Sequence, residues 1–320
     1  MSETLLQTID LTKNFPVRGR FFGERAQNIA VDRVNLSLRE GDTLGLVGES
    51  GSGKTTLGLT IMRLYEPTGG KIHFAGQDLT RMGKRALKPI RKQMQMIFQD
   101  PFASLDPRLS IAQIIAEPLE IHQIGTKTKR ADEAARLLER VGLAAEDLPR
   151  RPSEFSGGQQ QRIGIARALA LRPKLLICDE PVSALDVSVQ AQILNLLRDL
   201  QDEFGLAYLF ISHNIAVTAF MSRRIGVMYL GRLVEIGASR QITDAPRHPY
   251  TQTLISAIPE PDPSKRAIEV SVKGEMDAAF ERPTGCVFRL RCPLAEEICA
   301  AEEPKLRVIE EDQEVACHFA

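Results

Sequence analysis

GESGSGKTT, residues 48 to 56, is the stretch that decides the fold of this 320-residue chain. It fits the pattern G-x-x-x-x-G-K-[ST] and lies between the short apolar run TLGLVG and the helix-like segment TLGLTIMRLY. Its glycines at 48, 51 and 53 allow turns that a β-carbon would forbid, so that backbone N–H groups can point at phosphate oxygens. The positive end of the following helix adds to this attraction. The stretch predicts a strand, a phosphate-binding loop and a helix, the beginning of an α/β core that binds ATP or GTP.

Two side chains of this loop have expected roles beyond its backbone. Lys54 should reach the β- and γ-phosphates, and Thr55 should bind Mg²⁺ through its hydroxyl. The complete set of predicted nucleotide-binding residues in the loop is Gly48, Glu49, Ser50, Gly51, Ser52, Gly53, Lys54, Thr55 and Thr56.

LLICDE, residues 175 to 180, has the pattern of a buried strand that ends in two acids. A carboxylate at the end of a strand beside a phosphate loop is placed to hold the Mg²⁺ shell, and we assign this role to Asp179. Glu180 is then the expected base or orienting group for the attacking water. In isolation, an acidic pair after a strand is as often a helix start, where its charge suits the helix dipole.

The bulk composition is that of an ordinary soluble globular protein. Apolar residues make up 43% of the chain, and its 41 basic and 41 acidic side chains cancel. The longest apolar runs, such as LAYLFI (residues 206 to 211), are too short to cross a bilayer, and the first twenty residues do not resemble a secretory signal. The basic stretch RMGKRALKPIRK (residues 81 to 92) is typical of a solvated helix face or loop. We therefore expect a cytosolic chain that binds no nucleic acid.

The chain divides into segments that differ in composition and in the spacing of their apolar residues. Residues 1 to 40 read as strands, and residues 100 to 172 show apolar positions at helical spacing, which predicts a helical insert between two halves of the core. The core resumes with the strand KLLICDEP, a helix and the strand AYLFISH. From about residue 236 the composition shifts toward Pro, Glu and Arg, which indicates a boundary before a C-terminal extension.

SGGQQQR, residues 156 to 162, is a second candidate anion-binding turn, in which Ser156 caps a helix that opens with two glycines. In isolation it is an ordinary capped helix start. The ordered set of motifs, however, resembles an ABC-type ATPase cassette from about residue 4 to 260: the phosphate loop, SGGQQ, LLICDE, SALD (residues 183 to 186) and ISH ending at His213. The resemblance implies that two cassettes face head to tail, with each ATP between one chain's phosphate loop and the other chain's SGGQ turn.

The same resemblance implies roles for further residues. Gln99 would sense Mg²⁺ near the membrane-domain contact, and His213 would hold the γ-phosphate and the attacking water, so the implied catalytic residues are Glu180, His213 and Gln99. The implied Mg²⁺ ligands are Thr55, Gln99 and Asp179. The residues implied to serve the partner's nucleotide are Ser156, Gly157, Gly158, Gln159 and Asp186. Phe15 matches the aromatic that stacks on adenine, with Phe21 and Phe22 as competitors.

Four of the five cysteines lie in the last 35 residues: Cys286, Cys292, Cys299 and Cys317. Scattered free thiols are one reading; shared ligation of a metal is the other, although the spacing lacks the close pairs of typical zinc sites. With HPYTQTLISAIP and FQDPFASLDPR, this tail resembles the ATPases that serve oligopeptide and dipeptide importers. That resemblance implies a [4Fe–4S] cluster, with zinc as the alternative.

These observations together predict a P-loop NTPase of the ABC type: an α/β core with an N-terminal antiparallel β subdomain, a helical insert and a small Cys-rich extension. The expected domains are a cassette over residues 1–260, with its helical subdomain at about 100–172, and an extension over 261–320. The expected function is ATP hydrolysis that energises import of peptides or a related small solute.

The resemblance also implies an assembly. The expected partners are a paralogous ATPase subunit or a second copy, two transmembrane permease subunits and an extracytoplasmic solute-binding protein, with the chain peripheral on the cytoplasmic side of the inner membrane. A soluble ABC ATPase of nucleic-acid repair, translation or iron–sulfur assembly is the rival hypothesis. A third is that the extension acts mainly as a binding or regulatory module.

Overall fold

The structure, a computed structural model, describes residues 4–18, 25–257 and 283–320. In this part of the chain, eight strands form a central sheet in the order β11-β12-β10-β9-β3-β8-β7-β6. Their bounds are β3 (Thr43–Val47), β6 (Met94–Ile97), β7 (Leu175–Asp179), β8 (Ala207–Ser212), β9 (Arg224–Tyr229), β10 (Arg232–Ala238), β11 (Arg307–Glu310) and β12 (Gln313–Val315).

The middle of this sheet is parallel. β3 pairs in parallel with β8 and β9, and β7 pairs in parallel with β6 and β8. Every residue of β3, β7 and β8 is buried, which explains why these strands appear in the sequence as apolar runs rather than alternating patterns. Because parallel strands end at the same edge, the residues that follow β3, β7 and β8 are brought close together.

The predicted N-terminal β subdomain is a second, antiparallel sheet in the order β2-β1-β4-β5. Its strands are β1 (Thr4–Arg18), β2 (Arg25–Arg39), β4 (Gly69–Phe74) and β5 (Gln77–Asp78). Helix α1 (Lys54–Ile61) lies between the two sheets, because its buried Leu57 and Ile61 share one apolar cluster with strands of both. Helix α2 (Lys84–Arg91) carries the basic segment, and its Leu87 and Ile90 are buried in the same cluster.

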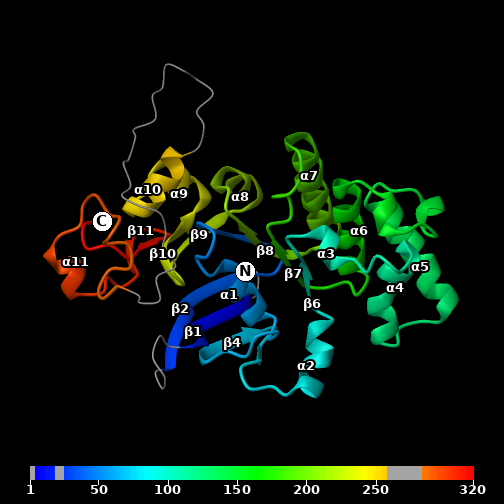
Figure 1. The fold of residues 1–320 in the computed structure, drawn as a ribbon, viewed down its shortest axis with the longest axis horizontal. Helices are drawn as coiled ribbons and strands as arrows, with labels where there is room; N and C mark the ends of the chain where they lie inside the picture. The colour runs from blue at the N-terminus through cyan, green and yellow to red at the C-terminus, as the bar shows by residue number, and fades with distance from the viewer. Residues whose placement is uncertain (1–3, 19–24, 258–282) are drawn as a thin grey trace.

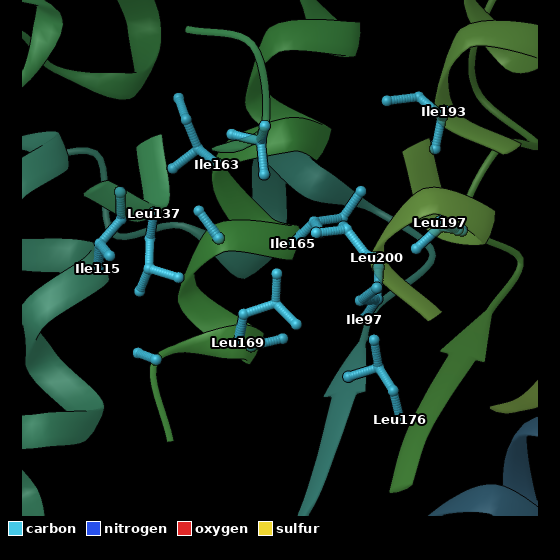
Figure 2. Close-up of a cluster of buried hydrophobic side chains, with 14 of the residues drawn as sticks. Ile97, Ile115, Leu137, Ile163, Ile165, Leu169, Leu176, Ile193, Leu197 and Leu200 are labelled. Atoms are coloured by element: carbon cyan, nitrogen blue, oxygen red, sulfur yellow. The ribbon is translucent and has the colours of Figure 1, made fainter. Parts of the chain in front are cut away.

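Helices occupy the predicted insert (Figure 1). Their bounds are α3 (Pro101–Ser104), α4 (Ile111–Ile121), α5 (Lys127–Arg140), the short 3₁₀ turns Ala145–Asp147 and Pro152–Glu154, and α6 (Gly157–Leu169). Figure 2 shows Ile165 and Leu169 of α6 between Leu137 of α5 and Leu176 of the central sheet. Helix α6 therefore joins the insert to the core, and α7 (Val187–Phe204) packs against the same cluster.

The last part of the chain returns to the central sheet. Helices α8 (Ile215–Met221), α9 (Ser239–Asp244) and α10 (Pro249–Ser256) precede it, and α11 (Glu297–Ala301) lies within it. Strand β12 pairs antiparallel with β10, where Glu235 faces Val315. Phe288 is fully buried in a cluster with residues of the cassette core. The described part of the extension is thus built onto the core sheet, while the predicted boundary at residue 260 lies outside the described residues.

The described helices include none with the length and apolar character needed to cross a bilayer.

Candidate functional site

The phosphate loop joins β3 to α1, as its sequence predicts. Gly53, the residue before α1, has a φ of 101°, and a β-carbon there would lie 2.2 Å from the carbonyl oxygen of Ala30. Only glycine fits this position without moving backbone, so the loop conformation depends on it.

Lys54 folds back over the loop. Its ammonium donates hydrogen bonds to the carbonyl oxygens of Gly48 (2.7 Å) and Glu49 (2.9 Å) and to Ser52 Oγ (3.2 Å). Burial lowers the pKa of Lys54, and the nearby charges of Glu180, Asp179 and Glu49 oppose that shift. The ammonium therefore lies in a site where a phosphate oxygen would be a stronger partner than neutral carbonyls.

Thr55 and Asp179 meet, as expected for residues that share a cation. Thr55 Oγ1 donates to Asp179 Oδ1 at 3.0 Å. Burial raises the pKa of Asp179 to about 6, and the charge of Glu180 adds to this, against the Thr55 hydrogen bond and the Lys54 charge. A hydroxyl and a carboxylate are the hard oxygen ligands that Mg²⁺ prefers, so this pair fits the cation.

Glu180 is the centre of the site. Its φ of 46° is in the left-handed region, and its N–H donates to the Ile211 carbonyl at 2.9 Å. One carboxylate oxygen, Oε2, accepts from Gln99 Nε2 at 3.0 Å and lies 3.2 Å from His213 Nδ1. The structure therefore brings together the three residues expected to be catalytic, and a strained backbone holds the acid between them.

The SGGQ turn begins α6 in the helical insert. Ser156 Oγ accepts from the Gln159 N–H at 3.4 Å while Gln159 Oε1 accepts from the Ser156 N–H at 2.9 Å, a reciprocal cap. Gly158 faces α7, since a β-carbon there would lie 2.5 Å from Val189 Cγ1. Ser156 and Gln159 are exposed, as is Asp186 just before α7. These residues are therefore accessible, and their action on a neighbour's nucleotide stays a prediction.

Phe15, the residue predicted to stack on adenine, contacts two side chains in the structure. Phe15 contacts Tyr65 edge to face, with ring centroids 5.2 Å apart, and the Lys13 ammonium lies 4.7 Å from its ring centre. Its competitors Phe21 and Phe22 lie outside the described residues.

The described part of the chain gives no support for the predicted metal site on the four C-terminal cysteines. Cys286, Cys292, Cys299 and Cys317 are free thiols, and no three His, Cys, Asp or Glu side chains of the described residues are grouped to hold a metal. Burial raises the pKa of Cys286 and of Cys292, and the neighbouring thiols add to both shifts. A metal ion binds thiolates and releases their protons, so these shifts belong to the metal-free thiols, and the [4Fe–4S] cluster and its zinc alternative stay predictions.

Two residues that contact the phosphate loop were not predicted. The Glu49 N–H donates to Tyr250 Oη at 2.8 Å, and the Arg291 guanidinium donates to both Glu49 carboxylate oxygens, at 2.8 and 3.1 Å. Tyr250 ends the HPY triplet, which in the sequence contributes only to the resemblance to peptide-importer ATPases. Arg291 directly precedes Cys292, and nothing in the sequence near it signals a loop contact.

The fold carries both a phosphate loop and a capped SGGQ turn, and together they define an ABC-type ATP-binding cassette. Its Thr–Asp pair and the glutamate that contacts both Gln99 and His213 belong to an ATPase. Residues 31–183 match the family described as ABC transporter, and residues 234–299 match the one described as oligopeptide/dipeptide transporter, C-terminal region. The chain belongs to the ATP-binding subunits of ABC transporters of the oligopeptide/dipeptide type.

Individual relatives agree with this family. The oligopeptide transport ATP-binding protein AppF of Bacillus subtilis (strain 168) is 49% identical over 321 residues, covering 99% of this chain and 98% of AppF. The probable peptide ABC transporter ATP-binding protein y4tS of Sinorhizobium fredii is 48% identical, with 99% and 90% covered. The dimeric, post-hydrolysis cassette MJ0796 bound to ADP and Pi is a solved structural neighbour: TM-score 0.66, 29% identity, 74% of this chain and 99% of that chain.

Proposed function

We propose that this chain hydrolyses ATP to energise the import of peptides. The observation that carries the catalytic part is the single Glu180 oxygen that Gln99 and His213 share, next to the Asp179–Thr55 pair. The cargo class rests on the relatives, whose names refer to oligopeptide or peptide transport. Dipeptides, longer peptides and related small solutes stay open as individual cargoes.

In this proposal each residue acts through an atom that already contacts another residue of the site. Glu180 accepts a proton from, or orients, the attacking water, and His213 and Gln99 hold its carboxylate. Lys54 moves its ammonium from loop carbonyls to phosphate oxygens. Thr55, Gln99 and Asp179 would hold Mg²⁺, which when bound neutralises the charge that develops on the phosphoryl oxygens.

The proposed reaction centre is shared between two subunits. The phosphate loop precedes α1 in the core, whereas the SGGQ turn begins α6 in the helical insert (Figure 1). Ser156, its glycines and Gln159 present exposed or half-buried positions that another subunit can reach. In the proposal, this turn and Asp186 serve the nucleotide of the neighbouring subunit, which is a second copy or a paralogue.

The proposed complex includes two permease subunits and an extracytoplasmic solute-binding protein. This chain would bind the permeases peripherally, on the cytoplasmic side of the inner membrane. Exposed Phe98 and Phe102, on either side of Gln99 and Asp100, give the apolar surface that such docking needs.

The shared centre is tested with two variants in parallel. Glu180→Gln should bind ATP but hydrolyse it roughly 10²–10⁴ times more slowly, and it should accumulate as a dimer in light scattering. Ser156→Arg should keep ATP binding at its own loop and lose hydrolysis. Glu203→Gln, a surface change on α7, is the control. Full hydrolysis by Ser156→Arg, or by a strictly monomeric preparation, would contradict the proposal.

A metal centre on the four cysteines is a separate proposal. Its support is the donor set, four thiols within one short extension, together with the cluster that the resemblance of that extension to peptide-importer ATPases implies. The side-chain arrangement does not favour it. Anaerobic purification followed by iron, acid-labile sulfide and zinc analysis decides the matter, and a metal-free sample with full activity would reject the proposal.

A further inference from the structure

We propose that Arg291 and Tyr250 are positioning residues for the phosphate loop, and that through them the C-terminal extension strengthens ATP binding by this chain. The inference rests on the proposed nucleotide site at residues 48 to 56. It assigns to the extension a part in the ATPase reaction that does not depend on any metal.

The backbone N–H, the carbonyl oxygen and the carboxylate of Glu49 all make hydrogen bonds. Its N–H donates to Tyr250 Oη at 2.8 Å, its carbonyl oxygen accepts from Lys54 at 2.9 Å, and its carboxylate accepts both arms of Arg291. The Arg291 side chain is 14% exposed and that of Glu49 is 29% exposed. A two-armed bond from a planar guanidinium fixes orientation as well as distance, and its partial burial protects it from screening.

Arg291 is itself held by a packed aromatic cluster. Tyr229, Tyr250 and Phe288 contact one another with ring centroids 4.7 to 5.3 Å apart. The guanidinium carbon of Arg291 lies 5.8 Å from the ring centre of Tyr229, and the Arg291 N–H donates to the Phe288 carbonyl at 3.0 Å. Because Phe288 is fully buried, the extension presents Arg291 to the loop from a rigid base.

Tyr250 is anchored in a different way. The buried Glu235 carboxylate on β10 accepts from the backbone N–H groups of Arg247 and His248, at 2.9 and 3.0 Å, and from Gln313 Nε2 at 2.8 Å. One carboxylate therefore ties the start of α10 to both β10 and β12. Tyr250 is consequently held at a fixed place relative to the sheet that carries the phosphate loop.

Fixing Glu49 should matter because the loop is glycine-rich. Glycines lose more conformational freedom on ordering than other residues do, and a loop that is already ordered avoids that cost when ATP binds. Without Arg291 the loop would lose order before binding. We expect a higher KM for ATP with a largely unchanged kcat, because Glu180, Gln99 and His213 keep their mutual contacts.

The test is equilibrium ATP binding and steady-state hydrolysis by full-length variants. Arg291→Gln should weaken ATP binding about tenfold, which corresponds to about 1.4 kcal/mol. Arg289→Gln is the matched control, since Arg289 lies two residues away and donates to Thr284 instead. Arg291→Lys should recover only part of the affinity, because an ammonium cannot make the two-armed bond. Unfolding midpoints without nucleotide identify any variant that has lost its fold.

A double-mutant cycle checks that the effect passes through Glu49. Glu49→Gln and Arg291→Gln should each weaken binding, and the double variant should be no weaker than either alone. Additive losses, or equal affinities of Arg291→Gln and Arg289→Gln, would overturn the inference. Lys54→Ala separates a failure of the proposed nucleotide site from a failure of this inference. If Lys54→Ala still binds ATP, the proposed nucleotide site is wrong. If Lys54→Ala does not bind ATP while Arg291→Gln binds it normally, only the role of Arg291 is wrong.

Discussion

His248, the first residue of the HPY triplet, should make the contact between the extension and the phosphate loop sensitive to acid. The ring is 1% exposed, and burial lowers its pKa to about 3 from an ordinary 6.5. Its Nδ1 accepts a hydrogen bond from the Tyr250 N–H at 3.1 Å, which requires that this nitrogen carry no proton. The folded protein therefore holds His248 neutral, in contact with the residue that reaches Glu49.

The sign and size of the effect follow from these two pKa values. Below pH 6.5 the unfolded chain takes up a proton at this ring and the folded chain does not, so stability falls as the pH falls. At pH 5 the ring is 1.5 units below its ordinary pKa, and each unit costs about 1.36 kcal/mol. The expected loss is about 2 kcal/mol, nearly all of it between pH 7 and pH 5.

Amide hydrogen exchange of α10 and of residues 283–320 measures this loss locally. After correction for the intrinsic exchange rates, protection in the wild type should fall about 30-fold between pH 7 and pH 5. His248→Asn should remove most of that dependence, because asparagine cannot titrate yet still offers an oxygen to the Tyr250 N–H. Identical pH dependences of the wild type and the variant would refute the reasoning.

Two further predictions concern glycines. Gly53→Ala should abolish ATP binding, because its β-carbon would lie 2.2 Å from the Ala30 carbonyl oxygen. A β-carbon at Gly51 would meet nothing within 4 Å, so Gly51→Ala should cost only about 1–2 kcal/mol of folding free energy, from its left-handed backbone. Equal ATP-binding constants of the two variants would contradict this prediction. Gly158→Ala should lower the unfolding midpoint through its clash with Val189, and adding Val189→Ala should restore it. An unshifted midpoint in Gly158→Ala would contradict this prediction, because it would show that α6 and α7 move apart without cost.

The core of the fold was predictable because its signals are local. GESGSGKTT fixes a strand, a loop and a helix, and strands buried on both faces, such as Leu175–Asp179, must be apolar throughout. The fold class is confirmed by the antiparallel N-terminal sheet and by the similarity to solved cassettes. The sequence did not predict that β12 would join β10, since the Glu235–Val315 pairing spans many residues and the short strand has no strong pattern.

The candidate site was predictable for a related reason. Asp179, Glu180 and His213 follow strands that end at one edge of a parallel sheet, so their meeting follows from the topology once the strands are recognised. Gln99 follows β6 at the same edge. The metal prediction came from cysteine count and resemblance alone, and the described residues show no group of ligands that supports it.

Arg291 shows what such reasoning misses. It meets Glu49 across 242 residues of sequence, and a single arginine between two cysteines has the pattern of any surface charge. The cysteines and Arg291 nevertheless share one small folded unit: the Cys286 N–H donates to the Cys299 carbonyl at 2.8 Å, and Arg291 follows in the next turn. A substitution that unfolds this unit would release Arg291 from the phosphate loop. Weakened ATP binding in a cysteine variant is therefore no proof of a metal centre unless the Arg291–Glu49 pair is tested alongside it.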